Sequence, residues 1–201
     1  MEPRRTFSDD PRPWRVLSRE YLHRKPWLTL RQDRVCLPSG AEIGEYWVTE
    51  YPDWVNVVAT TPRDELVLIR QYRHGIGGVH FELAAGVIDA EDPGPEAAAR
   101  RELREETGYG GGRWSHLMTI SANPALQSNL VHCYLAEGVE PAGPVAHEGT
   151  EDIRVHVVPV SEGLGLIDGG EIVQALNIAP LTRYLLGRRP PPGRAPADGL
   201  R

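Results

Sequence analysis

The stretch Arg101-Glu-Leu-Arg-Glu-Glu-Thr-Gly108 carries the strongest local signal in this chain of 201 residues. With the residues before it, it predicts a helix over 96–107, because Ala, Glu, Arg and Leu all favour helices. Pro95 suits the first helical turn, where its missing N–H is not needed. Gly108 suits the position that ends the helix. We therefore expect one well-bounded, highly charged helix near the middle of the chain.

Three acidic side chains of this helix share one face. Glu102, Glu105 and Glu106 are spaced three and four residues apart, which makes them neighbours on the helix surface. Like charges at this spacing repel, and a cation placed between them reverses that effect. Carboxylate oxygens are the ligands that Mg²⁺ prefers, with water and substrate phosphates completing its shell. Arg101 lies four residues before Glu105 and is expected to pair with it. Taken alone, the string also fits a solvated surface helix.

The residues before the helix favour a site over a solvated surface. A strand over 79–83 contains Glu82, and Ala84-Ala85-Gly86 leaves it. A glycine such as Gly86 lets backbone approach a ligand closely. The carbonyl of Ala85 offers one more oxygen ligand.

The order of the expected elements is strands, one central helix, more strands and a final helix. This order predicts an α+β (mixed α/β) sandwich with a mixed sheet, not a doubly wound parallel sheet. The expected strands are 27–37, 43–51, 54–60, 65–72, 79–83, 114–120, 130–137 and 153–159. The final helix is expected over 170–186, with a kink at Pro180. We divide the chain into a β-rich segment over 1–55 with a small hairpin, a main domain over 56–187, and a flexible tail over 188–201.

Composition narrows the class of function. The formal net charge is −6, which argues against binding of the nucleic-acid backbone as the main activity. No apolar run is long enough to span a bilayer, and the first residues lack the apolar segment of a signal peptide. Cys36 and Cys133 lack metal-ligand spacing and are interpreted as buried thiols. We expect a cytoplasmic protein that binds neither nucleic acid nor membrane.

The runs Glu82-Leu-Ala-Ala-Gly86 and Arg101-Glu-Leu-Arg-Glu-Glu-Thr-Gly-Tyr109 resemble the Nudix box. That signature is a glycine, five residues, a glutamate, seven residues, and then Arg-Glu-apolar-x-Glu-Glu-x-Gly-apolar. The second half fits with Tyr109 in the last place. In the first half Asp92 stands in the place of the glutamate, one residue too far from the helix, which indicates an insertion in the loop 89–95. Glu91 and Asp92 are therefore both candidates for the loop acid.

The flanking runs 68–73, 151–157 and 170–175 are similar to the ADP-ribose and nucleoside-diphosphate-sugar pyrophosphatase branch of that superfamily. The resemblance implies the Nudix α/β/α sandwich. It also implies Mg²⁺-dependent hydrolysis of ADP-ribose or a related nucleotide sugar to a nucleoside monophosphate and a sugar phosphate, with Mn²⁺ as an alternative ion. Members of this branch commonly form homodimers through the N-terminal segment.

The resemblance also implies roles for individual residues. Glu102, Glu105 and Glu106 would bind the metal with the Ala85 carbonyl and Glu82, and Arg73 would hold a phosphate. Gly86, Arg101 and Gly108 would be structural. The general base is expected on the loop 146–152. There Glu148 and Glu151 both qualify, with His147 ranked third, and the sequence does not decide between them.

Substrate recognition beyond the phosphates is less defined by the sequence. The segment 121–130 lacks the branch's usual Ser-Pro-Gly-x-x-x-Glu pattern. Its amides Asn123, Gln127 and Asn129 could read a sugar or a base, or could only turn the chain. Trp47 is one of several N-terminal aromatic residues that could stack on a base, although rings at alternating positions also define the buried face of a strand.

Three other readings remain. A related Nudix hydrolase would act on GDP-mannose, a dinucleotide or coenzyme A. A Nudix-fold ligand sensor without catalysis would be expected to lack box glutamates, whereas Glu102, Glu105 and Glu106 are all present. A generic binding module with an acidic surface helix would show no dependence on magnesium.

Overall fold

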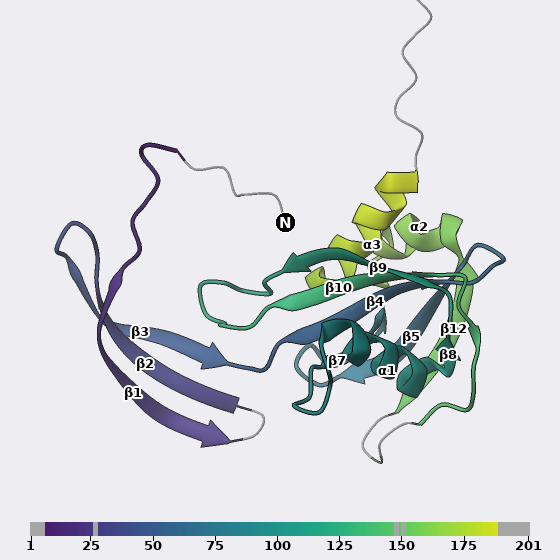
Figure 1. The fold of residues 1–201 in the computed structure, drawn as a ribbon, viewed down its shortest axis with the longest axis horizontal. Coiled ribbons are helices and arrows are strands. Elements are labelled where there is room, and N and C mark those ends of the chain that lie inside the picture. Colours follow the sequence, from purple (N-terminus) through teal and green to yellow (C-terminus); the bar gives the residue numbers. More distant parts are fainter. Residues whose placement is uncertain (1–6, 26–27, 147–148, 150–151, 189–201) are drawn as a thin grey trace, which may run out of the picture. The chain divides into compact units, whose positions relative to one another are not determined.

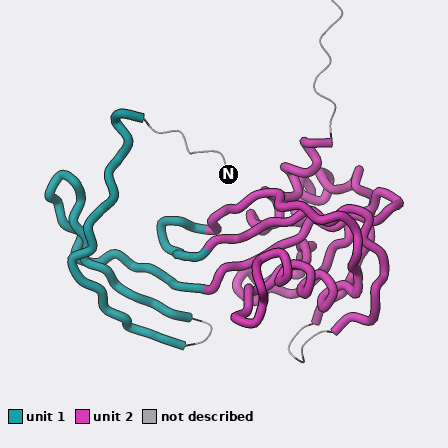
Figure 2. Tube along the Cα trace, in the orientation of Figure 1, with its two compact units in different colours: residues 1–51, 123–129 teal, residues 52–122, 130–201 magenta. Residues whose placement is uncertain are grey.

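The computed structural model describes residues 7–25, 28–146, 149 and 152–188. These residues form two compact units, one of residues 1–51 and 123–129 and one of residues 52–122 and 130–201 (Figure 2). The chain therefore leaves the larger unit after residue 122, contributes residues 123–129 to the N-terminal unit, and then returns to the larger unit. The tail expected over 188–201 lies outside the described residues except for Arg188.

The larger unit is built on a mixed sheet that, over the described residues, has seven strands. The strands are β4 (Trp54–Thr60), β5 (Glu65–Arg73), β6 (Gly78–Glu82), β7 (Ala84–Val87), β9 (Arg113–Ile120), β10 (Val131–Glu137) and β12 (Ile153–Pro159). Their order is β12-β5-β4-β10-β9, with β6 paired to β5 and β7 paired to β4. Strands β4 and β10 run parallel, while the other pairs are antiparallel. This arrangement confirms the mixed sheet that the sequence predicts.

Helices cover the two faces of this sheet (Figure 1). The helix α1 (Pro95–Thr107) packs Ala98, Ala99 and Leu103 against one face, and all three are fully buried. Full burial of a leucine side chain stabilises a fold by about 2 kcal/mol. The opposite face is covered by η1 (Val160–Glu162), α2 (Gly163–Asp168) and α3 (Ala175–Arg188). A two-stranded ladder of β8 (Tyr109–Gly110) and β11 (Glu140–Pro141) completes the unit.

The N-terminal unit is an antiparallel sheet in the order β1-β2-β3. Its strands are β1 (Arg15–Lys25), β2 (Leu28–Cys36) and β3 (Glu42–Glu50). The sequence predicts only the hairpin of the last two strands. Strand β1 escapes prediction because nearly all of its side chains are exposed, so it shows no alternation of buried and exposed residues.

Two further boundaries differ from the prediction. Residues 84–87 do not leave the sheet but form β7, because their backbone pairs with the start of β4. The final helix begins at Ala175 rather than near Gly170. Before it, the N–H groups of Glu171 and Ile172 bond to the carbonyl of Leu166 instead of entering a helical turn. Within the described ranges, no helix combines the length and apolar character needed to cross a bilayer.

Candidate active site

Helix α1 is held at both ends as the sequence predicts. Pro95 occupies its first turn, and Gly108 ends it with a φ of 74°. That backbone conformation is open to glycine at little cost, and it directs the Gly108 N–H to the Arg104 carbonyl at 2.8 Å. The C-terminal end of the helix is therefore fixed by a backbone hydrogen bond at Gly108.

Two of the three expected glutamates lie directly against the backbone of β7. The N–H of Ala85 donates to Glu106 Oε2 at 2.9 Å, and Glu106 is only 5% exposed. A Cβ atom at Gly86 would lie 2.1 Å from the carboxyl carbon of Glu102, so no other residue fits there unless Glu102 moves. Glu105, by contrast, has a half-exposed side chain.

Arg101 is the common partner of the acids around this helix. Its guanidinium donates to Glu102 at 2.8 Å, to Glu105 at 3.0 Å and to Asp92 at 2.9 Å. It also donates to the carbonyl of Val87 at 3.0 Å. The expected pair of Arg101 with Glu105 is therefore present, within a larger network.

This network moves the pKa of several groups. The hydrogen bond from Arg101 holds the pKa of Asp92 below its ordinary value, and the bond to Asp92 in turn raises the pKa of Arg101. Burial raises the pKa of Glu102, although the charge of Arg101 works against that shift. Desolvation is thus the larger of the two effects on the pKa of Glu102. The positive charge of Arg101 compensates only in part for the cost of burying the Glu102 carboxylate.

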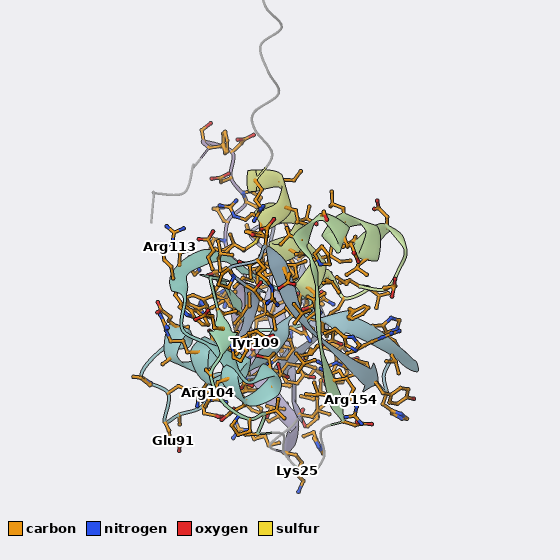
Figure 3. All side chains as sticks on the ribbon, turned by 90° about the vertical axis from the view of Figure 1, so that its right-hand side faces the viewer. Lys25, Glu91, Arg104, Tyr109, Arg113 and Arg154 are labelled. Carbon is orange, nitrogen blue, oxygen red and sulfur yellow. The ribbon has the colours of Figure 1, made fainter. Side chains whose placement is uncertain are left out.

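The structure distinguishes the two candidates for the loop acid. Asp92 binds Arg101 through both of its carboxyl oxygens and caps the N–H of Asp89 at 2.9 Å. Glu91 is exposed and projects outward at the periphery of the molecule (Figure 3). Asp92 is therefore the acid that faces the helix, whereas Glu91 is turned outward.

A second ion pair lies on β5 and β6. Arg73 donates to both oxygens of Glu82, at 2.8 and 2.6 Å, in the bidentate geometry that a guanidinium favours. Glu82 is buried, whereas the side chain of Arg73 is 46% exposed. The pair thus fixes a cationic group that remains accessible to solvent.

A cavity of about 320 Å³, here called the α3 cavity, borders both Arg73 and strand β7. It is lined by Arg73, by the backbone of Ala85 and Gly86, and by Asn56 on β4 and Gln174 and Asn177 at the start of α3. Sequence reasoning missed these three amide residues. Asn56 could have been noticed as the one amide inside the β-branched run Trp54–Thr60, because buried polar side chains need partners.

The donor set fits a divalent cation. Glu102, Glu105 and Glu106 offer hard oxygen ligands on one helix face, and the β7 backbone comes against Glu102 at Gly86 and against Glu106 through the Ala85 N–H. Within the described ranges, no three His, Cys, Asp or Glu side chains are grouped closely enough to hold an ion as they stand. The carboxylates are instead engaged by Arg101 and by the Ala85 amide.

The other expected residues fall elsewhere. Trp47, on β3, is 40% exposed, and Asn129 is buried; both belong to the N-terminal unit. The candidate bases Glu148 and Glu151, and His147, lie outside the described residues.

Two families match adjoining parts of the chain. Residues 50–175 match the NUDIX domain, and residues 14–48 match the nucleoside diphosphate sugar hydrolase N-terminal domain. The boundary between the two matches lies close to the division between the compact units.

Relatives of known name span most of the chain. An ADP-ribose pyrophosphatase of Mycobacterium tuberculosis is 33% identical over 82% of this chain and 79% of its own length. A GDP-mannose pyrophosphatase of Escherichia coli K12 is 34% identical over 62% of this chain and 68% of its own length. A solved structure described as an ADP compounds hydrolase has the same fold, with a TM-score of 0.78 at 23% identity, over 90% of this chain and 98% of that chain.

Proposed function

The chain belongs to the NUDIX domain family and is a Nudix hydrolase acting on nucleoside diphosphate derivatives. On that premise, we propose that it cleaves ADP-ribose or a closely related nucleotide sugar in the presence of Mg²⁺. Water would attack the diphosphate and break one P–O bond of the anhydride. The products would be a nucleoside monophosphate and a sugar phosphate. We further propose that it acts in the cytoplasm.

One observation carries this proposal. The α3 cavity is lined by Arg73 and by the Ala85–Gly86 backbone, and that same backbone contacts the carboxylates of Glu102 and Glu106. A diphosphate in the cavity would therefore lie between a guanidinium and an acidic helix face. A guanidinium binds phosphate oxygens directly, whereas the acidic face requires a cation to do so.

The metal-binding residues proposed here are Glu102, Glu105, Glu106 and the Ala85 carbonyl; Glu82, also expected as a ligand, is engaged by Arg73 in the absence of an ion. Mg²⁺ held there would neutralise charge on the diphosphate and lower the pKa of a bound water; Mn²⁺ is expected to substitute. Arg101 would position Glu102 and Glu105, and Glu82 would hold Arg73 in the orientation that meets a phosphate. The general base, proposed as Glu148 or Glu151, would take the proton of the attacking water.

A second substrate of the same class is GDP-mannose. The 34% identity to a GDP-mannose pyrophosphatase favours it. Both candidates share the diphosphate and differ in base and sugar, so the metal-site chemistry is the same for both.

The test is a panel of nucleoside diphosphate derivatives incubated with Mg²⁺, with identification of the phosphate products. We expect turnover of ADP-ribose, and loss of at least about 100-fold in kcat for Glu106→Gln, because the variant removes a charge that no neighbour replaces. The variant should stay folded, since its amide oxygen can still accept the Ala85 N–H.

The matched control is Glu96→Gln, which removes one carboxylate from the same helix at a pair with Arg100 that is exposed on both sides. It should leave turnover nearly unchanged. Wild-type activity in Glu106→Gln, or no turnover of any nucleoside diphosphate derivative by the wild-type protein, would contradict the proposal.

A further inference from the structure

We propose that the α3 cavity is a subsite for the sugar of the substrate. It would bind, through hydrogen bonds to the hydroxyl groups, the sugar that the diphosphate links to the nucleoside. This inference rests on the proposed function, because it assigns a part of the same substrate. It adds two specificity residues, Asn56 and Gln174, to a site otherwise described by its charges.

The orientation of the Asn56 amide is fixed by α3. Asn56 Nδ2 donates to the carbonyl of Leu176 at 2.7 Å. In a regular helix that carbonyl would accept from residue 180, but Pro180 has no N–H to give. The amide nitrogen therefore has a defined partner, which leaves the oxygen Oδ1 of this cavity-lining residue as its group that can accept a further hydrogen bond.

This oxygen is an acceptor without a partner. Asn56 is only 1% exposed, and among the described residues its Oδ1 has no hydrogen-bond partner. A buried polar atom left in this state costs about 1–3 kcal/mol. The thiol of Cys133 is near this amide on the adjacent strand. A thiol is only a weak donor, so it leaves most of that cost in place.

Gln174 supplies the complementary group. Its Oε1 accepts from Asn177 Nδ2 at 2.6 Å, and Asn177 Oδ1 accepts from the N–H of Leu83 at 3.3 Å. The chain of amides therefore assigns the Gln174 oxygen to Asn177 and leaves its Nε2 to donate at the exposed edge of the cavity. The cavity thus offers a buried acceptor and a more exposed donor.

A sugar hydroxyl matches this pair, because it both donates and accepts a hydrogen bond. Arg73 is the charged side chain among the residues that line the cavity. It is also the proposed phosphate ligand, so the group next to it would be the one attached to that phosphate. The volume of about 320 Å³ lies at the low end of the usual range of ligand pockets, about 300–1,000 Å³, and suits one ring better than a whole nucleotide sugar.

The experiment is titration calorimetry in EDTA, where turnover stops, with two matched pairs of ligands. ADP-ribose is compared with ADP, and GDP-mannose with GDP. The variants are Gln174→Met and Asn56→Leu, which replace each amide by an apolar side chain of similar size. Gln32→Met, in the N-terminal sheet, makes the same chemical change away from the cavity. Gln174 is exposed, so this variant stays informative if Asn56→Leu fails to fold.

We expect each cavity variant to bind the nucleotide sugar about tenfold more weakly, which corresponds to one lost hydrogen bond of about 1.4 kcal/mol. Affinity for ADP and GDP should change less than about twofold, as should every affinity of Gln32→Met. An equal loss for sugar and diphosphate would assign the cavity to the nucleoside and overturn the inference. Unchanged affinities in both variants would show that neither amide contacts the sugar, and would overturn the inference as well.

The proposed function fails in a different way. Its failure appears in the wild-type protein, as no binding and no turnover of either nucleotide sugar. Failure of the subsite appears only in the variants, on a wild-type protein that binds and hydrolyses its substrate.

Discussion

At the scale of single residues, Arg101 decides how the acids of the site are arranged. One guanidinium contacts Asp92 from the loop and Glu102 and Glu105 from the helix. Its positive charge lies where the carboxylates would otherwise repel one another. Arg101 can therefore keep the proposed metal ligands in place without an ion, and a cation would compete with Arg101 for them.

Asp92 allows this network to be tested through pH. Its folded-state pKa is lowered from an ordinary value of 3.8 by Arg101. A lowered pKa means that the carboxylate adds stability above that ordinary value, and that this contribution disappears as the pH falls through the folded-state pKa. In EDTA, Asp92→Asn should thus lower the urea midpoint at pH 7 and lower it by a smaller amount at pH 3, below the ordinary value of 3.8.

The matched control for this measurement is Glu91→Gln, the exposed neighbour in the same loop. It should leave the urea midpoint unchanged at both pH values. If Glu91→Gln destabilised the protein at pH 7 and Asp92→Asn did not, the assignment of Asp92 as the loop acid would be wrong.

The limits of sequence reasoning are clear at this scale. The face shared by Glu102 and Glu106 follows from helical spacing, and the pair of Arg101 with Glu105 follows from the same rule. The choice between Glu91 and Asp92 does not, because it depends on how an irregular loop turns. The hydrogen-bond partner of Asn56 lies 120 residues away along the chain, so no local sequence pattern predicts it.

At the scale of elements, the site depends on helix α1 and strand β7 meeting closely. The helix and the strands β4 and β12 have nearly the predicted bounds, because their composition and their flanking residues agree. Strand β7 was not predicted, since four small or apolar residues acquire strand geometry only by pairing with β4. The short helix α2 likewise has no periodic pattern long enough to be read.

The end of α1 gives a prediction for this scale. Gly108 has a φ of 74°, and a Cβ there would lie 2.6 Å from the Gly143 carbonyl oxygen. Gly108→Ala should therefore lower the free energy of unfolding by about 2–4 kcal/mol, which combines the left-handed backbone with overpacking. Urea unfolding measures this loss.

Gly111→Ala separates the two causes. Gly111 has a φ of 73°, but a Cβ there would meet open space. This variant should lose only about 1–2 kcal/mol, the cost of the backbone conformation alone. Equal losses in the two variants would show that the contact with Gly143 does not matter.

At the scale of the whole molecule, the N-terminal unit has apolar side chains that its own sheet does not cover. They include Val16, Tyr21, Leu22, Leu28 and Trp47 on its three strands, which are each between 38% and 45% exposed. A protein interface would cover exposed apolar groups of this kind. We therefore retain the prediction of a homodimer formed through this unit.

Light scattering coupled to size-exclusion chromatography tests the prediction. The wild-type protein should elute with twice the mass of one chain, and the double variant Val16→Glu, Leu22→Glu should elute as a monomer. Leu186→Glu, on the exposed side of α3, puts the same charge on an apolar residue of the other unit and should remain a dimer. A monomeric wild-type protein would refute the prediction.

The segment 123–129 has a consequence for anyone who wishes to recombine such proteins. It lies in the middle of the chain, yet it belongs to the N-terminal unit, where Leu126 accepts from the backbone of Thr49 and Ala125 accepts from the Tyr46 hydroxyl. A graft or truncation at residue 51 would leave these seven residues behind without their partners. Modules of this architecture are exchanged intact only when both pieces are transferred together, so a family tree built from the first fifty residues alone would leave out part of the inherited unit.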